Sequence, residues 1–179
     1  MTKIVFSGFG GQGILTLGGV VANVAMLNNK QVTWMPSYGA EMRGGTANCS
    51  VIVSDKVIGS PIVQSGIDIL CAMNGPSLDK FLPRVKPGGI IFVNSSIVHK
   101  EVDRDDVKVI LVDATNVATS LGDSRVQNMV MLAGVLKALD LYSLEDVKST
   151  FQDKFGERYP KLIPLNMNAV KRGEELVDL

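Results

Sequence analysis

Short apolar runs alternate with longer segments of helical character through the first two thirds of the chain. The runs are rich in β-branched and aromatic side chains and end at glycine, proline or small polar residues, which predicts buried strands. These strands are expected at 3–7, 31–37, 47–54, 56–59, 69–74, 90–94 and 107–112. Apolar strands that alternate with helices are typical of a mostly parallel sheet whose two faces are both covered by helices.

The first predicted helix follows the first strand, over residues 14–29. It is rich in small and apolar residues and contains the adjacent glycines Gly18 and Gly19. Two glycines weaken an isolated helix, but they would let this helix lie close to the sheet.

Local signals predict three shorter features in the middle of the chain. Ser77 is expected to cap a short helix that runs to Val85, and Thr115 is expected to cap another. Pro87-Gly88-Gly89 is expected to form a turn before the next strand.

The last third of the chain is predicted to be helical. Residues 126–141 are apolar around most of the helix circumference, so this helix should be largely buried. Ser143-Leu144-Glu145-Asp146 is close to a capping box and starts the next helix, and a polar helix over 161–179 ends the chain. The sequence therefore predicts one α/β domain over residues 1–179, with C-terminal helices over about 126–179.

Glycines dominate the turn between the first strand and the first helix. The segment Gly8-Phe9-Gly10-Gly11-Gln12-Gly13 matches G-x-G-x-x-G, and Gly8, Gly10, Gly11, Gln12 and Gly13 are candidate cofactor-binding residues. Glycines permit close approach of a phosphate, and the N-terminus of the following helix offers free N–H groups and a positive dipole. The fold class is therefore Rossmann-like α/β, with a mostly parallel sheet, helices on both faces and a helical C-terminal tail. An alternative is that the glycines only allow tight packing of strand and helix.

The end of the second predicted strand bears on the choice of nucleotide. NAD-binding domains use an acidic residue there to hold the ribose hydroxyls. Trp34-Met35-Pro36-Ser37 provides no carboxylate, and the first one in this region is Glu41. Ordinary NAD binding is therefore disfavoured.

A second unusual loop follows, Ser37-Tyr38-Gly39-Ala40-Glu41-Met42-Arg43-Gly44-Gly45-Thr46-Ala47-Asn48-Cys49. Arg43 can bind a phosphate or carboxylate in bidentate fashion, and the paired glycines allow a partner to approach the backbone closely. The alternative is a surface turn with a local Glu41–Arg43 contact. The candidate interface residues in this loop are Tyr38, Gly39, Glu41, Arg43, Gly44 and Gly45, and Arg43 is also a candidate cofactor ligand.

Polar residues follow two later strands. Asn94 and Ser95 end one strand and are candidate cofactor-binding residues, although they could equally cap the next segment. Asp113 and Thr115 follow another strand, and Asn128 near the start of the long helix is a candidate interface residue. In parallel sheets ligands bind outside the carboxyl ends of the strands, so the loops at 8–13, 38–48 and 94–96 are expected at that edge, with 113–115 nearby.

Composition narrows the classes of function. The chain has 18 basic and 18 acidic residues, and this balance argues against a nucleic-acid-binding protein. Two cysteines and one histidine are too few for a structural zinc site or a cysteine-bound iron–sulfur cluster, so no metal site is expected. Cys49 and Cys71 are expected to be buried packing residues, and His99 to be exposed and not catalytic.

The cysteine content and the apolar segments also predict the cellular compartment. A disulfide framework is unlikely with two cysteines, which favours a reducing cytoplasm. The apolar stretch over residues 14–27 is shorter than the ~20 residues that cross a bilayer, so no membrane span is expected. The glycine motif interrupts the N-terminal apolar segment, which therefore reads as strand, turn and helix rather than as a signal peptide.

The two loops together carry a family resemblance. Phe6 to Gly13 followed by Pro36 to Cys49 resembles the gamma subunit of 2-oxoacid:ferredoxin oxidoreductases, of the 2-oxoglutarate or 2-oxoisovalerate type. Asp113-Ala114-Thr115 and Arg125-Val126-Gln127-Asn128-Met129 resemble the same family. The run Tyr38 to Gly45 is the most specific of these segments.

The resemblance implies a non-autonomous enzyme component with no catalytic residue of its own. Such enzymes oxidatively decarboxylate a 2-oxoacid, transfer the acyl group to coenzyme A and reduce ferredoxin. The resemblance places thiamine diphosphate and magnesium in alpha and beta subunits, places iron–sulfur clusters in beta and delta subunits, and gives the gamma subunit a share in coenzyme A binding. The isolated chain is expected to expose its partner surface and to form a homodimer through it. Two alternatives stay open: a stand-alone NAD(P)-binding oxidoreductase, and a non-catalytic assembly module.

Overall fold

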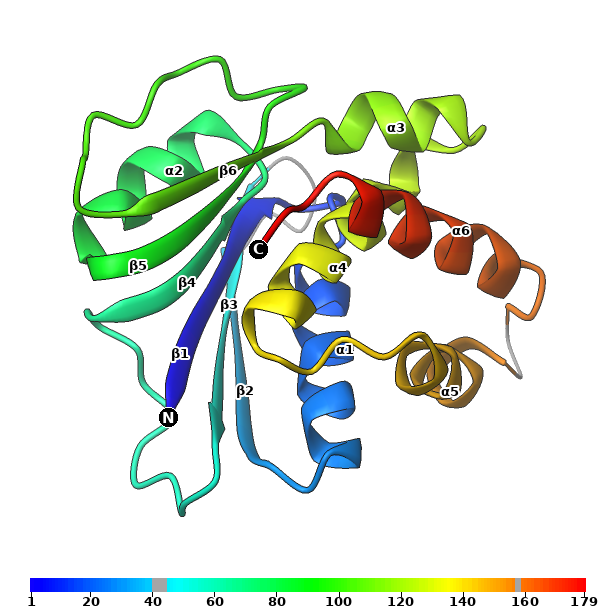
Figure 1. Ribbon diagram of the computed structural model, residues 1–179, viewed down its shortest axis with the longest axis horizontal. Helices are drawn as coiled ribbons and strands as arrows, with labels where there is room; N and C mark the ends of the chain where they lie inside the picture. Colours follow the sequence, from blue (N-terminus) through cyan, green and yellow to red (C-terminus); the bar gives the residue numbers. More distant parts are fainter. Residues whose placement is uncertain (40–44, 157–158) are drawn as a thin grey trace.

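Six strands form one sheet in the order β2-β3-β1-β4-β5-β6 (Figure 1). The computed structural model describes residues 1–39, 45–156 and 159–179, with residue 155 described by its backbone alone. The strands are β1 (Thr2–Phe9), β2 (Gln31–Tyr38), β3 (Thr46–Ser54), β4 (Ile67–Ala72), β5 (Val85–Asn94) and β6 (Lys108–Val112). β3 runs antiparallel to its neighbours β1 and β2, whereas the pairs β1–β4, β4–β5 and β5–β6 are parallel. Since β3 alone is reversed, the prediction of a mostly parallel sheet is confirmed.

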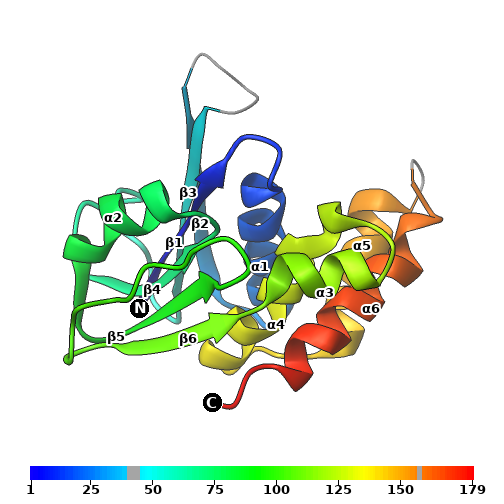
Figure 2. The same cartoon turned by 90° about the horizontal axis from the view of Figure 1, so that it is seen from above.

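Helices cover both faces of the sheet, as predicted. They are α1 (Ile14–Leu27), α2 (Gly75–Phe81), α3 (Ala114–Ser120), α4 (Gln127–Ala138), α5 (Leu144–Phe155) and α6 (Leu162–Glu175), with short 3-10 turns at Leu82–Arg84 and Ser124–Val126. In Figure 1, α1 and α4 lie against one face, α5 and α6 lie outside them, and α2 lies against the other face. The view from above in Figure 2 shows α3, α5 and α6 on the side away from α2.

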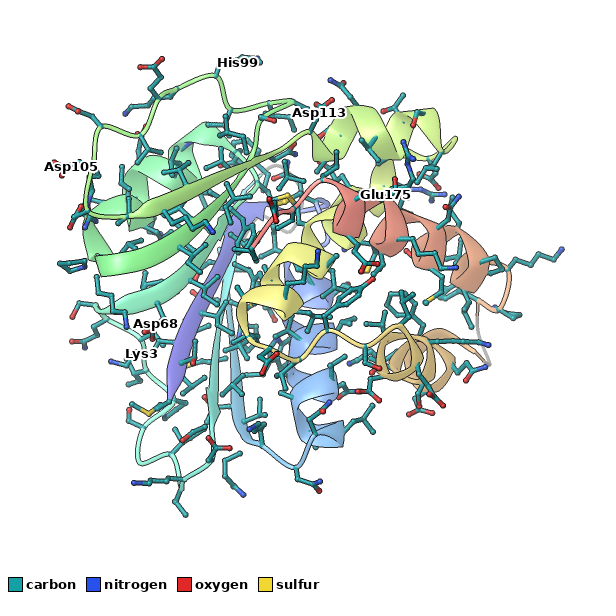
Figure 3. All side chains as sticks on the ribbon, in the orientation of Figure 1. Lys3, Asp68, His99, Asp105, Asp113 and Glu175 are labelled. Carbon is teal, nitrogen blue, oxygen red and sulfur yellow. The ribbon has the colours of Figure 1, made fainter. Side chains whose placement is uncertain are left out.

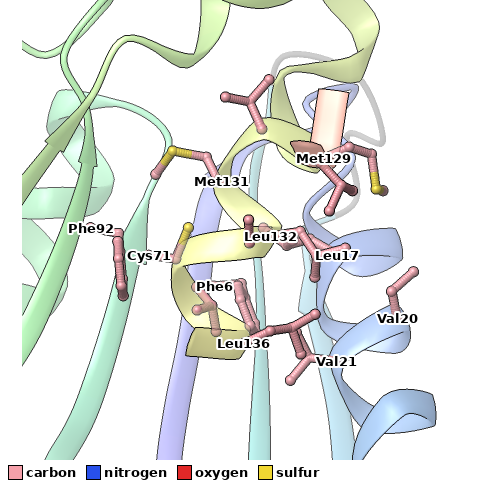
Figure 4. Packing of buried hydrophobic residues seen from close by; sticks show 14 of the residues in the cluster. Phe6, Leu17, Val20, Val21, Cys71, Phe92, Met129, Met131, Leu132 and Leu136 are labelled. Carbon is pink, nitrogen blue, oxygen red and sulfur yellow. The ribbon is translucent and has the colours of Figure 1, made fainter. Parts of the chain in front are cut away.

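The alternation of side chains along β1 divides the core into two clusters. Ile4 and Phe6 point into the larger cluster, which α1 and α4 complete, while Val5 points into the smaller cluster beneath α2. Figure 4 shows Phe6 packed with Leu17 of α1 and Leu136 of α4. Burial on both faces explains why the strands are nearly continuous apolar runs.

Small residues allow the helices to lie close to their neighbours. A Cβ added to Gly18 would collide with the Sγ of Cys49 on β3, which confirms the close approach predicted for α1. A Cβ added to Gly173 would collide with the carbonyl oxygen of Val130, so α6 crosses α4 at backbone contact.

Two predicted features in the loops are wrong. Residues 56–59 form no strand, because the N–H of Lys56 donates to the hydroxyl of Ser54 at 3.0 Å and turns the chain at the end of β3. Pro87–Gly89 is not a turn between elements but lies inside β5. Residues 86–89 bulge opposite Asp68, since Val85 pairs with Ile67 and Ile90 pairs with Ile69.

Two predicted caps are also wrong. α2 begins at Gly75, before Ser77, because the Asn74 side chain accepts the N–H of Ser77 at 2.9 Å and Pro76 suits the first turn. The helix ends at Phe81 rather than at Val85. Thr115 lies inside α3 rather than at its cap, and its N–H donates to Ser96 Oγ at 3.0 Å.

The C-terminal helices agree with the sequence pattern. Ser143 caps α5 by accepting the N–H of Asp146 at 3.2 Å, as the capping-box pattern predicts. α4 is buried along most of its length. Within the part of the chain that the structure describes, no helix is both long and apolar enough to cross a membrane.

Candidate ligand-binding site

The carboxyl end of β1 brings the two predicted loops together. The β1–β3 register places Phe9 beside Thr46 at the start of β3. One residue further on, the N–H of Gly10 donates to the carbonyl oxygen of Gly45 at 2.9 Å. The glycine loop and the end of the second loop are therefore joined by a backbone hydrogen bond.

The second loop is described at its two ends. Tyr38 is 59% exposed at the end of β2, and Gly39 is exposed beside it. Glu41, Arg43 and Gly44 lie outside the described residues. The interface and cofactor roles expected for this loop stay predictions.

Three positions in the first loop require glycine for structural reasons. Gly11 has φ 100° and Gly13 has φ 72°, backbone conformations in which an L side chain is strained. A Cβ on Gly13 would also collide with the amide nitrogen of Asn128. A Cβ on Gly8 would lie 2.6 Å from the Oε1 of Gln12. The glycines are therefore needed for the shape of the loop, in addition to any role toward a ligand.

Gln12 holds the loop in place from inside. Its Oε1 accepts the N–H of Phe9 at 2.7 Å and the amide of Asn74 at 3.2 Å. Its Nε2 donates to the carbonyl oxygen of Met73 at 3.2 Å. Both ends of the Gln12 amide are thus used within the chain, and they tie the loop to the turn between β4 and α2.

Asn128 supports the loop from α4. Its Nδ2 donates to the carbonyl oxygen of Gly13 at 3.1 Å, and its Oδ1 accepts the N–H of Met129 at 3.0 Å. The residue is 5% exposed. Within the chain Asn128 thus lies buried beneath the glycine loop, and the interface role expected for it stays a prediction.

A cavity of about 350 Å³ opens beside the loop. The described residues that line it are all uncharged and are Phe9, Gly10, Gly11, Gly13, Ile14, Leu15, Thr16, Tyr38 and Ala47. α1 begins here without a side-chain cap or an acidic residue in its first turn, and its first helical bond runs from the N–H of Leu17 to the carbonyl oxygen of Gly13. The N–H groups of the first turn and the helix dipole therefore favour an anionic group in this cavity.

Asn94 and Ser95 do not line this cavity. Asn94 is fully buried, and its Nδ2 donates to Thr115 Oγ1 at 2.9 Å and to Gln127 Oε1 at 3.2 Å. These bonds join the end of β5 to α3 and α4. Ser95 is half-buried, and its N–H donates to the carbonyl oxygen of Val112. The cofactor role expected for the pair stays a prediction, at a position apart from the glycine loop.

The two thiols are buried, and the histidine is exposed. Burial raises the pKa of Cys49 from its ordinary value of 9.0 to about 12, and burial likewise raises the pKa of Cys71. Figure 3 shows His99 on the connector between β5 and β6, where it is exposed. Among the described residues no group of three or more His, Cys, Asp or Glu side chains is placed to hold a metal ion.

Sequence reasoning missed Asn74 and Thr16. Asn74 both caps α2 and bonds Gln12, and the signal for it was the Asn-Gly-Pro run, which is typical of a capped helix start. Thr16 lines the cavity from the first turn of α1, and only the predicted helix start pointed toward it.

A glycine turn in left-handed conformation lies between the first strand and an uncapped helix at the carboxyl edge of the sheet, and this arrangement is typical of a Rossmann-like α/β domain. The chain belongs to the pyruvate ferredoxin/flavodoxin oxidoreductase family, whose model matches residues 3–176. The family expected from the two loops is thereby confirmed.

Curated relatives differ in how much of their length the chain spans. The chain is 37% identical over 179 residues to ketoisovalerate oxidoreductase subunit VorA of Methanothermobacter thermautotrophicus, covering 97% of this chain and 36% of VorA. It thus spans about a third of that relative. It is 32% identical to 2-oxoglutarate synthase subunit KorC of the same organism, covering 98% of this chain and 94% of KorC.

Solved structures share the fold. The gamma subunit of the keto/oxoacid ferredoxin oxidoreductase from Geobacter sulfurreducens has a TM-score of 0.81 at 29% identity, and the match covers 98% of this chain and 97% of that one. The 2-oxoglutarate:ferredoxin oxidoreductase from Magnetococcus marinus has a TM-score of 0.87 at 24% identity, and the match covers 98% of this chain and 30% of that one. The second match shows the fold alone.

Proposed function

We propose that this chain is the gamma-type component of a multisubunit 2-oxoacid:ferredoxin oxidoreductase, and that its glycine loop binds a phosphate of coenzyme A. Residues 1–179 would act as one domain, since α5 and α6 pack against α1 and α4. The observation that carries the proposal is the cavity over the uncapped first turn of α1.

The catalytic groups would come from other chains. As the family resemblance implies, thiamine diphosphate and magnesium would reside in alpha and beta subunits, and iron–sulfur clusters would reside in beta and delta subunits. These subunits would pass electrons to ferredoxin. Relatives named for ketoisovalerate and 2-oxoglutarate support a 2-oxoacid of one of these two types. Such a complex would work in the cytoplasm.

Coenzyme A fits the chemistry of the loop. Its diphosphate is the kind of group that free first-turn N–H groups and a helix dipole attract. The Magnetococcus marinus enzyme was solved with coenzyme A and succinyl-CoA bound. By contrast, β2 ends at Pro36-Ser37-Tyr38 without the carboxylate that would hold the ribose of NAD.

The test is a charge placed in the first turn of α1. Thr16 is the third helical residue after Gly13, where a carboxylate stabilises a helix but repels an anionic ligand. In the complex purified from its host through a tag on this chain, Thr16→Asp should weaken coenzyme A binding about tenfold or more and leave the melting temperature unchanged or higher. The neutral control Thr16→Asn should bind nearly as well as the native complex.

Three outcomes would contradict the proposal. Recovery of the tagged chain without partner subunits would argue against a component role. Equal coenzyme A affinity in Thr16→Asp and Thr16→Asn would indicate that the chain is an assembly module that does not bind coenzyme A. Micromolar binding of NADH or NADPH to the chain would favour a stand-alone oxidoreductase.

A further inference from the structure

β2 forms one edge of the sheet and lacks the features that usually protect an edge strand. Among the described residues only β3 pairs with it, so its outer backbone N–H and C=O groups have no strand partner (Figure 1). None of its eight residues is buried and none is charged. The opposite edge strand, β6, has five residues and carries Lys108. Since short length and charge are common ways to protect an edge, β2 is the edge that is open to pairing.

Exposed apolar side chains stand on both faces of β2. Trp34 is 45% exposed and lies with Val32 on the α1 side, where both line a cavity of about 570 Å³. Met35 is equally exposed and points to the opposite face, because side chains alternate along a strand. The indole N–H of Trp34 bonds the thiol of Cys49, so the ring is already ordered and loses little entropy when a partner covers it.

The 570 Å³ cavity extends the edge of β2 over the outer side of α1, and we call it the α1 groove. Gly19 and Ala22 present little side chain here, and Met26 is 62% exposed at the end of the groove. Helices approach more closely where the contacting side chains are small, so this side of α1 suits a second helix. The α1 groove is lined by Leu15, Thr16, Gly19, Ala22, Asn23, Met26, Val32, Trp34 and Lys154.

Antiparallel pairing of β2 with the β2 of a second copy determines where the other elements lie. Two identical antiparallel strands are related by a two-fold axis perpendicular to the sheet, so the sheet continues from one copy into the other. Such an axis keeps both α1 helices on the same face of the joined sheet. The outer sides of the two α1 helices, each with its α1 groove, therefore face each other across the axis.

The charges around the α1 groove suit contact between identical chains. Lys154 lines the groove from α5, and the neighbouring Asp153 lines a small cavity beside Met26 and Leu27. Within the described parts of the chain neither forms an ion pair. A two-fold contact brings the same patch of two chains together, so a patch that carries both signs can attract its copy. The 18 basic and 18 acidic residues add no net repulsion between chains.

We propose that β2 and the α1 groove form the contact surface for a second copy of this chain, with the two β2 strands paired antiparallel about a two-fold axis. The dimer covers Trp34, Met35 and Met26. This gives a definite surface to the homodimer expected of the isolated chain. The inference does not rest on the proposed function, since it requires neither coenzyme A nor another subunit.

The test measures the mass and the fluorescence of the purified chain over a concentration series that reaches hundreds of micromolar. Sedimentation equilibrium should show a species of twice the 19.2 kDa of the chain. Trp34 is the one tryptophan in the sequence, so its emission reports on this surface directly. The emission should shift to shorter wavelength over the same concentrations at which the dimer forms, because pairing removes the indole from water.

Lysine substitutions test which surface forms the dimer. Met35→Lys should raise the dimer dissociation constant about tenfold or more, because the two-fold axis brings two ammonium groups into one interface. Met26→Lys should weaken the dimer in the same way from α1. Leu111→Lys is the matched control, because it places the same charge at a 62% exposed position on the opposite edge strand, and it should leave the dissociation constant unchanged. All three positions are exposed, so the monomers should keep the native melting temperature.

Three outcomes would overturn the proposal. The first is a chain that stays monomeric at hundreds of micromolar. The second is a dimer that Leu111→Lys dissociates and Met35→Lys leaves intact. The third is an isolated native chain that is monomeric while Met35→Lys releases other subunits from the tagged complex, which would show that this face binds a different subunit. None of these outcomes bears on the coenzyme A proposal, which Thr16→Asp tests separately.

Discussion

The Asn128 side chain donates a hydrogen bond to the carbonyl oxygen of Gly13 at 3.1 Å, across 115 positions of sequence. Gly13 begins α1, and Asn128 lies in the first turn of α4. The same amide nitrogen occupies the space that a Cβ on Gly13 would need. The shape of the candidate ligand site is therefore fixed by a contact between two helices as well as by its own glycines.

Replacing Asn128 should loosen the glycine loop. Asn128→Leu keeps a similar volume but removes the bond to the N–H of Met129 and one of the two bonds to the carbonyl of Gly13, which keeps the N–H of Leu17. It should therefore cost about 1–3 kcal/mol of unfolding free energy. Chemical denaturation measures this cost, and titration of the complex should show weaker coenzyme A binding. The exposed Asn168 on α6 provides the control Asn168→Leu, which should change neither quantity appreciably. Equal stabilities of the two variants would contradict the supporting role of Asn128.

Because a Cβ on Gly13 would collide with Asn128, substitutions at Gly13 and Asn128 should have non-additive effects on the unfolding free energy. Gly13→Ala should destabilise the chain by about 2 kcal/mol or more, because it combines a strained φ with a collision against Asn128. In an Asn128→Ala background the collision is absent, so the additional cost of Gly13→Ala should fall to about 1–2 kcal/mol from φ alone. A double-mutant cycle by urea denaturation measures the coupling. Strict additivity would mean that the loop moves away from Asn128 at no cost.

Gly18→Ala should test the close packing of α1 on the sheet. The new Cβ would collide with the Sγ of Cys49, and overpacking of a buried contact costs about 1–3 kcal/mol. Cys49→Ala should partly rescue Gly18→Ala, because it removes the colliding sulfur. Gly59→Ala, where a Cβ meets nothing within 4 Å, is the control and should be close to neutral. The measurement compares the melting temperatures of the native chain, Gly18→Ala, Gly18→Ala combined with Cys49→Ala, and Gly59→Ala.

The buried thiols predict a loss of stability at high pH. Burial raises the pKa of Cys49 from 9.0 to about 12 in the folded chain, so the unfolded chain releases its thiol proton first. The stabilisation is complete below pH 9 and should decline between pH 9 and about 12, with a slope of up to about 1.4 kcal/mol per pH unit from this thiol. Cys49→Ala should show a shallower decline than the native chain in denaturation measured across this range. An unchanged slope would show that the thiol ionises without cost in the fold.

Much of the fold was predictable because it depends on local pattern. β1, α1 and β3 were located from apolar periodicity, and the cap of α5 from its serine and aspartate. The predictions from sequence were wrong where a specific side-chain or strand contact overrides the local residue pattern. Asn74 displaced Ser77 as a cap because it sits one residue before Gly75-Pro76, and Pro87–Gly89 was absorbed into a bulge that only the pairing with β4 reveals.

The sequence by itself determined the class of this protein and the place of its glycine loop, because glycines between a strand and a helix act through local backbone freedom. Tertiary structure decided what surrounds that loop. It turned Asn128 inward and buried Asn94 between β5, α3 and α4. It also brought Lys154 of α5 over Gly19 of α1, 135 positions earlier. Contacts between helices so far apart in sequence depend on how each helix packs on the sheet, and no local pattern of residues records that packing.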